Sequence, residues 1–322
     1  MAMEIKMDKI YLIIILAIIL TIALGFIILP ELKKHKIGQS IRKVGPKSHY
    51  SKEGTPTMGG IIFLIPTIIL SLIFIPLNLT SIILLISMIG FGAIGFIDDF
   101  RKLVLKQSEG LKPKEKLVLQ FALAFLISIL AYKSDKETIT KLLIPFTNFY
   151  LPVSFLGIPI MIFIIVGTTN ATNLTDGLDG LLATVSIPVL ISLFILSSDI
   201  ENKYFAAILF ASLIGFLLFN SNPAAVFMGD TGSMAIGGAI VALAINLKIP
   251  IYLIIFGGIY VIETLSVILQ VLSYRYRNKK RIFLMTPIHH HFELKGYKEQ
   301  KIVTGFAIVS TILSLITLVA IL

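Results

Sequence analysis

The chain lacks cysteine altogether and carries few charged residues. None of its 322 residues is a cysteine, so neither a disulfide framework nor a thiolate metal site can form, although a metal held by histidine and carboxylate groups stays open. Charged residues make up 14% of the chain and hydrophobic residues 56%, and the mean hydropathy is +0.94. This balance excludes a soluble globular domain and indicates an integral membrane protein.

Ten segments are apolar enough to be candidate membrane-spanning helices. A helix needs about 20 apolar residues to cross the hydrocarbon core. The predicted spans are 10–29, 58–77, 81–97, 117–132, 158–169, 178–197, 204–219, 233–247, 251–274 and 302–322. The fifth is the least regular, because Pro152 and Pro159 interrupt it. The sequence therefore predicts an all-α polytopic membrane protein of about ten transmembrane helices, with residues 1–322 forming one integral membrane domain.

Basic residues are distributed unequally between the two sides of these spans. Three loops on one side carry 21 of the 28 lysines and arginines. The opposite side carries Lys6, Lys9, Lys133, Lys136, Lys141, Lys203 and Lys248. Since loops rich in Lys and Arg stay in the cytoplasm, both termini are predicted to be extracytoplasmic. The polar segments 170–179 and 220–232 then lie on the cytoplasmic side, where an active site is expected. The longest outer loop, 133–157, is predicted to form a small hairpin.

A long uncharged stretch ends in two neighbouring carboxylates. No charged residue occurs over 54–97, and Asp98 and Asp99 follow directly. Two ionised neighbours repel each other, so a site that keeps both usually holds a cation. Acids near helix starts often only cap the helix. Five aspartates that meet on one membrane face beside basic loops favour a Mg²⁺ site and phosphate chemistry instead. They are Asp98, Asp99, Asp176, Asp179 and Asp230.

Two glycine-rich polar segments follow further along the chain. In 167–180 the residues Asn173, Asp176 and Asp179 are spaced by three, which would place them on one face of a helix. Backbone amides at a helix start suit a phosphate, a uracil edge or a ribose, whereas ordinary turn and cap chemistry is the alternative. In 220–233, Phe227 could stack on a base and Gly229 allows close backbone approach. A simple connecting turn with a buried aromatic is the alternative there.

Three consecutive histidines, His289 to His291, lie in the segment 285–293. Neighbouring side chains on a helix point about 100° apart, so the three cannot easily ligate one ion. Contacts to a pyrophosphate or to sugar oxygens are favoured over a zinc site.

Glu263 lies inside the ninth span. An ionisable group there costs about 2.5–3.5 kcal/mol, so Glu263 is predicted to face protein or a water-filled groove. Together with Pro250 and Gly257, it predicts a bent or broken helix. The basic segment 38–60 could cover the site and hold an anionic substrate, although topology alone would also require its positive charge.

Six ordered motifs resemble a known family. They read GQSIRKVGPKSHYSKEGTPTMGG, GFIDDF, GTTNATNLTDGLDG, NPAAVFMGDTGS, GGIYVIET and RIFLMTPIHHHFELKG. Over nearly its whole length the chain resembles the phospho-N-acetylmuramoyl-pentapeptide transferases, a branch of the polyprenyl-phosphate N-acetylhexosamine-1-phosphate transferases. The segment TPIHHHFE points to this branch. Thr172, where a small aliphatic residue is expected, is a departure.

The resemblance implies an enzyme of the bacterial cytoplasmic membrane with Mg²⁺ as cofactor. It would transfer phospho-MurNAc-pentapeptide from UDP-MurNAc-pentapeptide to undecaprenyl phosphate, giving lipid I and UMP. The resemblance also implies a homodimer, and no nucleic acid is expected as a partner. The catalytic residues it implies are Asp98, Asp99, Asp230 and His290, with the three aspartates at the metal. The substrate-binding residues it implies are Lys52, Thr57, Lys102, Lys116, Asn173, Asp176, Asp179, Asn220, Phe227, Gly229, Gln270, His289, His290 and His291.

Alternatives to this function and to its mechanism remain. A sister enzyme that uses UDP-N-acetylglucosamine would share the Asp-Asp pair. A transporter would also keep intramembrane acids, but transporters more often show inverted repeats and charges near the bilayer midplane, whereas these acids lie at one edge. A covalent aspartyl-phosphate route competes with direct attack by the lipid phosphate.

Overall fold

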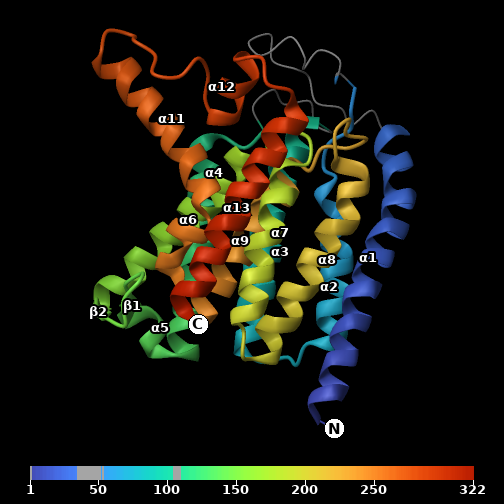
Figure 1. The fold of residues 1–322 in the computed structure, drawn as a ribbon, viewed down its shortest axis with the longest axis vertical. Helices are drawn as coiled ribbons and strands as arrows, with labels where there is room; N and C mark the ends of the chain where they lie inside the picture. The colour runs from blue at the N-terminus through green and yellow to red at the C-terminus, as the bar shows by residue number, and fades with distance from the viewer. Residues whose placement is uncertain (1, 35–51, 53, 104–109) are drawn as a thin grey trace.

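The computed structural model describes residues 2–34, 52, 54–103 and 110–322 (Figure 1). Most of the basic segment 38–60 lies outside the described residues. The prediction that this segment covers the site therefore also concerns residues outside the described part of the chain. The α-helices are α1 (Ala2–Lys34), α2 (Gly60–Phe74), α3 (Leu79–Leu103), α4 (Pro113–Ser134), α5 (Lys136–Thr140), α6 (Gly157–Thr175), α7 (Leu181–Leu196), α8 (Ile200–Asn220), α9 (Gly229–Asn246), α10 (Leu253–Phe256), α11 (Gly258–Tyr276), α12 (Ile288–Leu294) and α13 (Glu299–Ile321). Short 3₁₀ turns cover Ser154–Leu156 and Pro250–Tyr252.

Six of the described helices are long and apolar enough to cross a membrane. They are Lys9–Lys34, Leu79–Lys102, Pro113–Ser134, Ser154–Thr175, Ile200–Asn220 and Glu299–Ile321. The bent pair Pro250–Phe256 and Gly258–Tyr276 makes a seventh if it is counted as one span, while α2 and α7 are apolar but shorter. A polytopic helical protein is therefore confirmed, and the count of ten spans stays a prediction. Both termini lie at the same end of the bundle, away from α12 (Figure 1).

The helix α9 forms the centre of the bundle. Every residue from Thr231 to Ile245 is buried, as is typical of a helix surrounded by others. Small residues permit this: a Cβ at Gly237 would overlap Thr172 of α6, and one at Gly238 would lie 2.6 Å from a backbone oxygen of α3. Small residues at helix contacts are the usual means of close packing in membranes. The helix α9 is thus held between α3 and α6.

One glycine sets the approach of the end of α3 to the start of α9. A Cβ at Gly95 would overlap the backbone carbonyl of Asp230, and backbone cannot move aside as a flexible side chain can. We expect Gly95→Ala to lower the free energy of unfolding by about 1–3 kcal/mol, the usual cost of overpacking, measured as the unfolding midpoint in detergent. Gly305→Ala on α13 is the matched control, because its Cβ would meet no atom within 4 Å. Equal midpoints for the two variants would contradict the role of Gly95.

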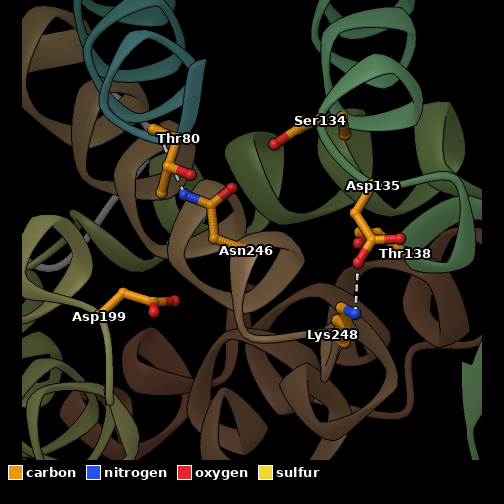
Figure 2. A pocket seen from close by; sticks show the side chains of 8 residues that line it. Thr80, Ser134, Asp135, Thr138, Asp199, Asn246 and Lys248 are labelled. Atoms are coloured by element: carbon orange, nitrogen blue, oxygen red, sulfur yellow. Dashed lines mark hydrogen bonds and ion pairs between the residues drawn. The ribbon is translucent and has the colours of Figure 1, made fainter. Parts of the chain in front are cut away.

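A hairpin and a polar pocket lie at one end of the bundle. Strands β1 (Lys141–Leu143) and β2 (Tyr150–Pro152) pair antiparallel, with Leu142 opposite Leu151, which confirms the hairpin predicted in 133–157. A pocket of ≈ 270 Å³ at this end is lined by Thr80, Ala131, Ser134, Asp135, Thr138, Asp199, Asn246 and Lys248 (Figure 2). Lys248 forms an ion pair with Asp135 and lowers the pKa of that carboxyl.

The helix that carries Glu263 is broken, as the sequence predicts. The segments Pro250–Phe256 and Gly258–Tyr276 meet at 82°, and Gly257 lies at the break. A Cβ there would lie 2.5 Å from the carbonyl oxygen of Leu253, so only glycine fits this bend. Glu263 itself is fully buried and contacts a histidine of α12, which confirms that it faces protein.

Candidate active site

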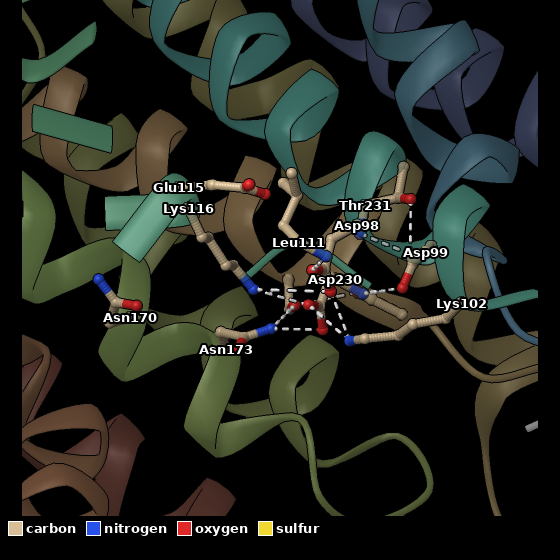
Figure 3. Close-up of polar contacts among 12 residues, drawn as sticks. Asp98, Asp99, Lys102, Leu111, Glu115, Lys116, Asn170, Asn173, Asp230 and Thr231 are labelled. Atoms are coloured by element: carbon tan, nitrogen blue, oxygen red, sulfur yellow. Dashed lines mark hydrogen bonds and ion pairs between the residues drawn. The ribbon is translucent and has the colours of Figure 1, made fainter. Parts of the chain in front are cut away.

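Three aspartates meet where α3 ends and α9 begins (Figure 3). Asp98 and Asp99 come from the last turns of α3, and Asp230 from the first turn of α9. Each offers a carboxylate oxygen, and these oxygens lie within 4.8 Å of one another. Asp98 is 2% exposed and Asp99 is 4% exposed. The structure thus brings together the three residues that the sequence predicts as metal ligands.

The two neighbouring aspartates have different surroundings. Asp99 accepts hydrogen bonds from the backbone N–H of Thr231 at 2.9 Å, from its hydroxyl at 2.7 Å and from the backbone N–H of Asp230 at 3.3 Å. It therefore caps the start of α9. Asp98 accepts one hydrogen bond from the Leu111 backbone N–H at 2.9 Å and forms an ion pair with Lys102. Asp98 thus has fewer fixed backbone partners than Asp99.

Asp230 is held by its neighbours at both carboxylate oxygens. Its Oδ1 accepts from the Asn173 side-chain amide at 2.9 Å. Its Oδ2 lies 2.7 Å from Lys116 Nζ and 3.4 Å from Lys102 Nζ. Lys116 Nζ also lies 3.9 Å from Asp98 Oδ2. Asp98 and Asp230 therefore share the two ammonium groups of Lys102 and Lys116. Clustered carboxylates of this kind suit Mg²⁺, which takes one or two carboxylates and completes its shell with water and phosphate oxygens.

The segment 176–180 is a turn, so the sequence prediction of one helical face is wrong. The helix α6 ends at Thr175, Asp176 is its C-cap, and Gly180 has a left-handed φ of 71° at the start of α7. Asn173 consequently reaches Asp230, whereas Asp179 points to a different cluster. Burial, together with the charges of Asp230 and Asp99, raises the pKa of Asp176 to about 8.

Asp179 belongs to a polar cluster that joins four distant parts of the chain. Lys52 Nζ lies 2.7 Å from Asp179 Oδ1 and 2.7 Å from Glu299 Oε1. The Asn222 amide donates to Asp179 Oδ2 at 3.0 Å and to Glu299 Oε2 at 2.9 Å. The Asp179 backbone N–H donates to Glu299 at 2.6 Å. Burial opposes the charge of Lys52, but the hydrogen bonds that it donates to Asp179 and Glu299 raise its pKa above the usual value.

The three histidines of α12 turn to three different partners. His289 Nδ1 lies 3.0 Å from Glu263 Oε1, and both side chains are fully buried. His290 Nδ1 lies 2.7 Å from Glu293 Oε2, and His291 Nδ1 accepts from the Leu284 backbone N–H at 3.1 Å. This divergence agrees with the prediction that one ion cannot easily take all three.

His289 also joins α12 to the turn after α6. A Cβ at Gly177 would overlap the His289 ring, so the glycine is what lets this turn pack against α12. The aspartate cluster, the Lys52 cluster and α12 are therefore parts of one connected region of the protein.

Comparisons with known proteins identify the family. The model of glycosyl transferase family 4 matches residues 81–248, and signature 1 of the phospho-N-acetylmuramoyl-pentapeptide-transferases matches residues 52–64. The phospho-N-acetylmuramoyl-pentapeptide-transferase of Caldanaerobacter subterraneus is 48% identical over 92% of this chain and 94% of its own length. That of Desulfitobacterium hafniense is 46% identical over 97% and 98%, and that of Clostridioides difficile 45% over 95% and 96%. The chain belongs to the phospho-N-acetylmuramoyl-pentapeptide-transferase family.

The signature segment of this transferase packs against the 220–233 segment. The Phe227 backbone N–H donates to the Pro56 carbonyl at 2.8 Å, and the Phe227 carbonyl accepts from the Gly59 N–H at 2.9 Å. Gly229 has a φ of 76°, and a Cβ there would lie 2.7 Å from Asp99 Oδ2 and 2.9 Å from Thr57 Oγ1. Thr57, Gly229 and Asp99 are thus neighbours.

Two predicted substrate-binding residues of the transferase form side-chain hydrogen bonds to backbone groups of nearby loops. Asn220 donates to the Val226 carbonyl at 2.9 Å. Gln270 accepts from the N–H groups of Ile282 and Phe283, at 2.9 and 3.0 Å. Both thereby fix loops near the site, and their contact with substrate stays a prediction. Sequence reasoning missed Glu299, because one acid at the start of a span gives no local signal of partners so far away in the chain.

Proposed function

We propose that this chain transfers phospho-MurNAc-pentapeptide from UDP-MurNAc-pentapeptide to undecaprenyl phosphate, releasing UMP and forming lipid I. The name of its relatives and the match to their signature segment support this activity. The single observation that carries the chemistry is the aspartate cluster with its two lysines, because transfer between two anionic phosphates needs both cation-binding carboxylates and fixed positive charge.

Mg²⁺ is the proposed cofactor, with Asp230 as its firmest ligand beside Asp98 and Asp99. The donor set fits, since all three residues offer hard carboxylate oxygens within 4.8 Å of one another. When bound, Mg²⁺ would supply positive charge to the pyrophosphate oxygens. The ammonium groups of Lys102 and Lys116 would neutralise further phosphate charge and hold the two anions in position.

Asp98 is the residue proposed to orient or deprotonate the lipid phosphate. Its single backbone hydrogen bond leaves its other oxygen turned to Lys102. An oxygen of the lipid phosphate would attack the sugar-side phosphorus of the pyrophosphate. The new P–O bond forms there as the bond from that phosphorus to the UMP oxygen breaks. The Lys52 cluster and Phe227 are proposed to surround the nucleotide, and the three histidines, with His290 as a catalytic residue, the pyrophosphate or amino sugar.

The finer topology is also a proposal. Ten spans, extracytoplasmic termini and an active site facing the cytoplasm are supported by the bias of basic residues and by the position of both termini at one end of the bundle (Figure 1). We further propose that the protein lies in the bacterial cytoplasmic membrane, consists of a single integral membrane domain and forms a homodimer.

The decisive experiment is UMP release by the purified protein with undecaprenyl phosphate and Mg²⁺. One reaction receives UDP-MurNAc-pentapeptide and the other UDP-N-acetylglucosamine. We expect release only in the first, abolished by EDTA and restored by excess Mg²⁺. Release only in the second would assign the chain to the sister activity. Absence of release in both from folded protein would reject the transferase proposal, and full activity in EDTA would reject the cofactor.

A further inference from the structure

Two amide side chains face each other between α4 and α6, within two of the helices that are long and apolar enough to cross a membrane. The Asn170 amide nitrogen donates to Gln120 Oε1 at 2.8 Å, and the Gln120 amide nitrogen lies 3.4 Å from Asn170 Oδ1. Gln120 is fully buried. Asn170 uses its second N–H within its own helix, on the Val166 carbonyl at 2.8 Å. The pair is thus reciprocal, and it leaves neither side-chain oxygen of the two amides without a donor.

This amide pair lies one helical turn from the two side chains that hold Asp230, and Figure 3 shows Asn170 and Asn173 on the same helix. Lys116 precedes Gln120 by four residues on α4, and Asn173 follows Asn170 by three residues on α6. Residues at these spacings share one face of a helix. Lys116 contacts Asp230 Oδ2 and Asn173 contacts Asp230 Oδ1. Gln120 is therefore next to Lys116, and Asn170 is next to Asn173. Lys116 and Asn173 are the two groups that contact opposite carboxylate oxygens of Asp230.

Hydrogen-bonded amides constrain two helices in a way that apolar side chains do not. Apolar contacts between membrane helices tolerate small rotations and shifts, because lipid and protein interior are similarly apolar. A reciprocal amide pair forms in one register only, and a shift leaves polar groups unpaired in a dry environment. The outer side of α4 is exposed at Val118, Phe121 and Phe125, so protein contacts hold this helix mainly on its inner side.

We propose that Gln120 and Asn170 are positioning residues, which fix the register of α4 against α6 so that Lys116 and Asn173 hold Asp230 from both sides. The inference rests on the proposed function, because its kinetic consequence is read in that reaction. A displacement of about 1 Å can lower a rate about a hundredfold. A partial loss of register is therefore expected to lower kcat of UMP release about tenfold.

The kinetic test compares Gln120→Leu, Asn170→Leu, the double variant and the exchange of the two residues (Gln120→Asn with Asn170→Gln). We expect each single variant to lower kcat about tenfold with KM changed less than about threefold. The double variant should be no worse than either single variant, and the exchange should recover kcat to within about threefold of wild type. A double variant with wild-type kcat would overturn the proposal, because only the unpaired amide would then have mattered.

A second amide pair provides the matched control. Asn246 on α9 donates to Asn202 Oδ1 on α8 at 2.9 Å. Asn246 lies at the opposite end of α9 from Asp230. Asn202→Leu should lower the unfolding midpoint about as much as Gln120→Leu and leave kcat unchanged. If Asn202→Leu lowers kcat tenfold as well, general destabilisation explains both variants and the proposal fails.

A distance measurement separates this inference from the proposed function. Because the chain has no cysteine, spin labels can be attached to only two introduced cysteines, at the exposed Lys114 on α4 and the exposed Phe163 on α6. In the full-length protein, Gln120→Leu should broaden or shift the distance distribution between the labels, and Asn202→Leu should not. An unchanged distribution would overturn the positioning role. Absence of UMP release from wild type would reject the proposed function without affecting this readout.

Discussion

Replacing Asp230 by asparagine is expected to slow UMP release about a thousandfold while the protein stays folded. The carboxylate uses both oxygens, one toward Asn173 and the other toward Lys116 and Lys102. An asparagine offers only one oxygen, and its NH₂ group would face either the Asn173 amide or the two ammonium groups. The variant also removes the firmest proposed Mg²⁺ ligand. Initial rates over a Mg²⁺ titration measure the effect, and the Mg²⁺ concentration for half-maximal rate should rise.

Asp199→Asn is the matched control for this variant. Asp199 is exposed, precedes α8 and lines the pocket at the opposite end of the bundle. It undergoes the same chemical change without touching the aspartate cluster, so its rate should stay within about twofold of wild type. Ordinary activity of Asp230→Asn, with an unfolding midpoint equal to that of wild type, would remove Asp230 from the catalytic centre.

The second large effect is expected for Lys116→Met, with a loss of about a hundredfold in kcat/KM for UMP release. Lys116 is the closer of the two ammonium groups to Asp230 and also lies near Asp98. Its removal leaves Asp98 and Asp230 with Lys102 as their remaining lysine partner among the described residues, and it removes one charge that would hold a phosphate. Groups aimed at phosphate oxygens in a site of this kind contribute about 10²–10³ in rate.

Lys114→Met tests whether charge alone explains that loss. Lys114 is exposed, two residues before Lys116 on the same helix, and the change in net charge is identical. We expect its kcat/KM to stay within about twofold of wild type. Equal losses in the two variants would show that the overall positive charge of this helix end matters, rather than the contact between Lys116 and Asp230.

Local signals allowed the sequence to predict a good part of the fold and of the site. The Asp98-Asp99 pair stands out because it ends a long uncharged stretch, and the structure places it beside Asp230. The bend near Gly257 and the inward position of Glu263 follow from a glycine and an acid inside one apolar run. In each case the relevant residues are close together in the chain.

The errors and omissions have a different physical origin. The regular spacing of Asn173, Asp176 and Asp179 predicts a helical face, but the helix stops at Thr175 and a turn follows. The glycines at 177 and 180 favour that turn. Local turn formation therefore overrides the helical spacing of these three polar residues. Gln120 could have been suspected, since an amide inside a span needs a partner. Its partner Asn170 is 50 residues away, and no spacing rule encodes such a distance.

The Lys52 cluster has a consequence for the order in which the protein is completed. Asp179 and Asn222 are synthesised well before Glu299, the carboxylate that accepts from both of them and from Lys52. Ribosomes add about 5–20 residues per second, so these segments wait several seconds for their last partner. The predicted nucleotide end of the site is therefore completed only when the start of the final helix has been made.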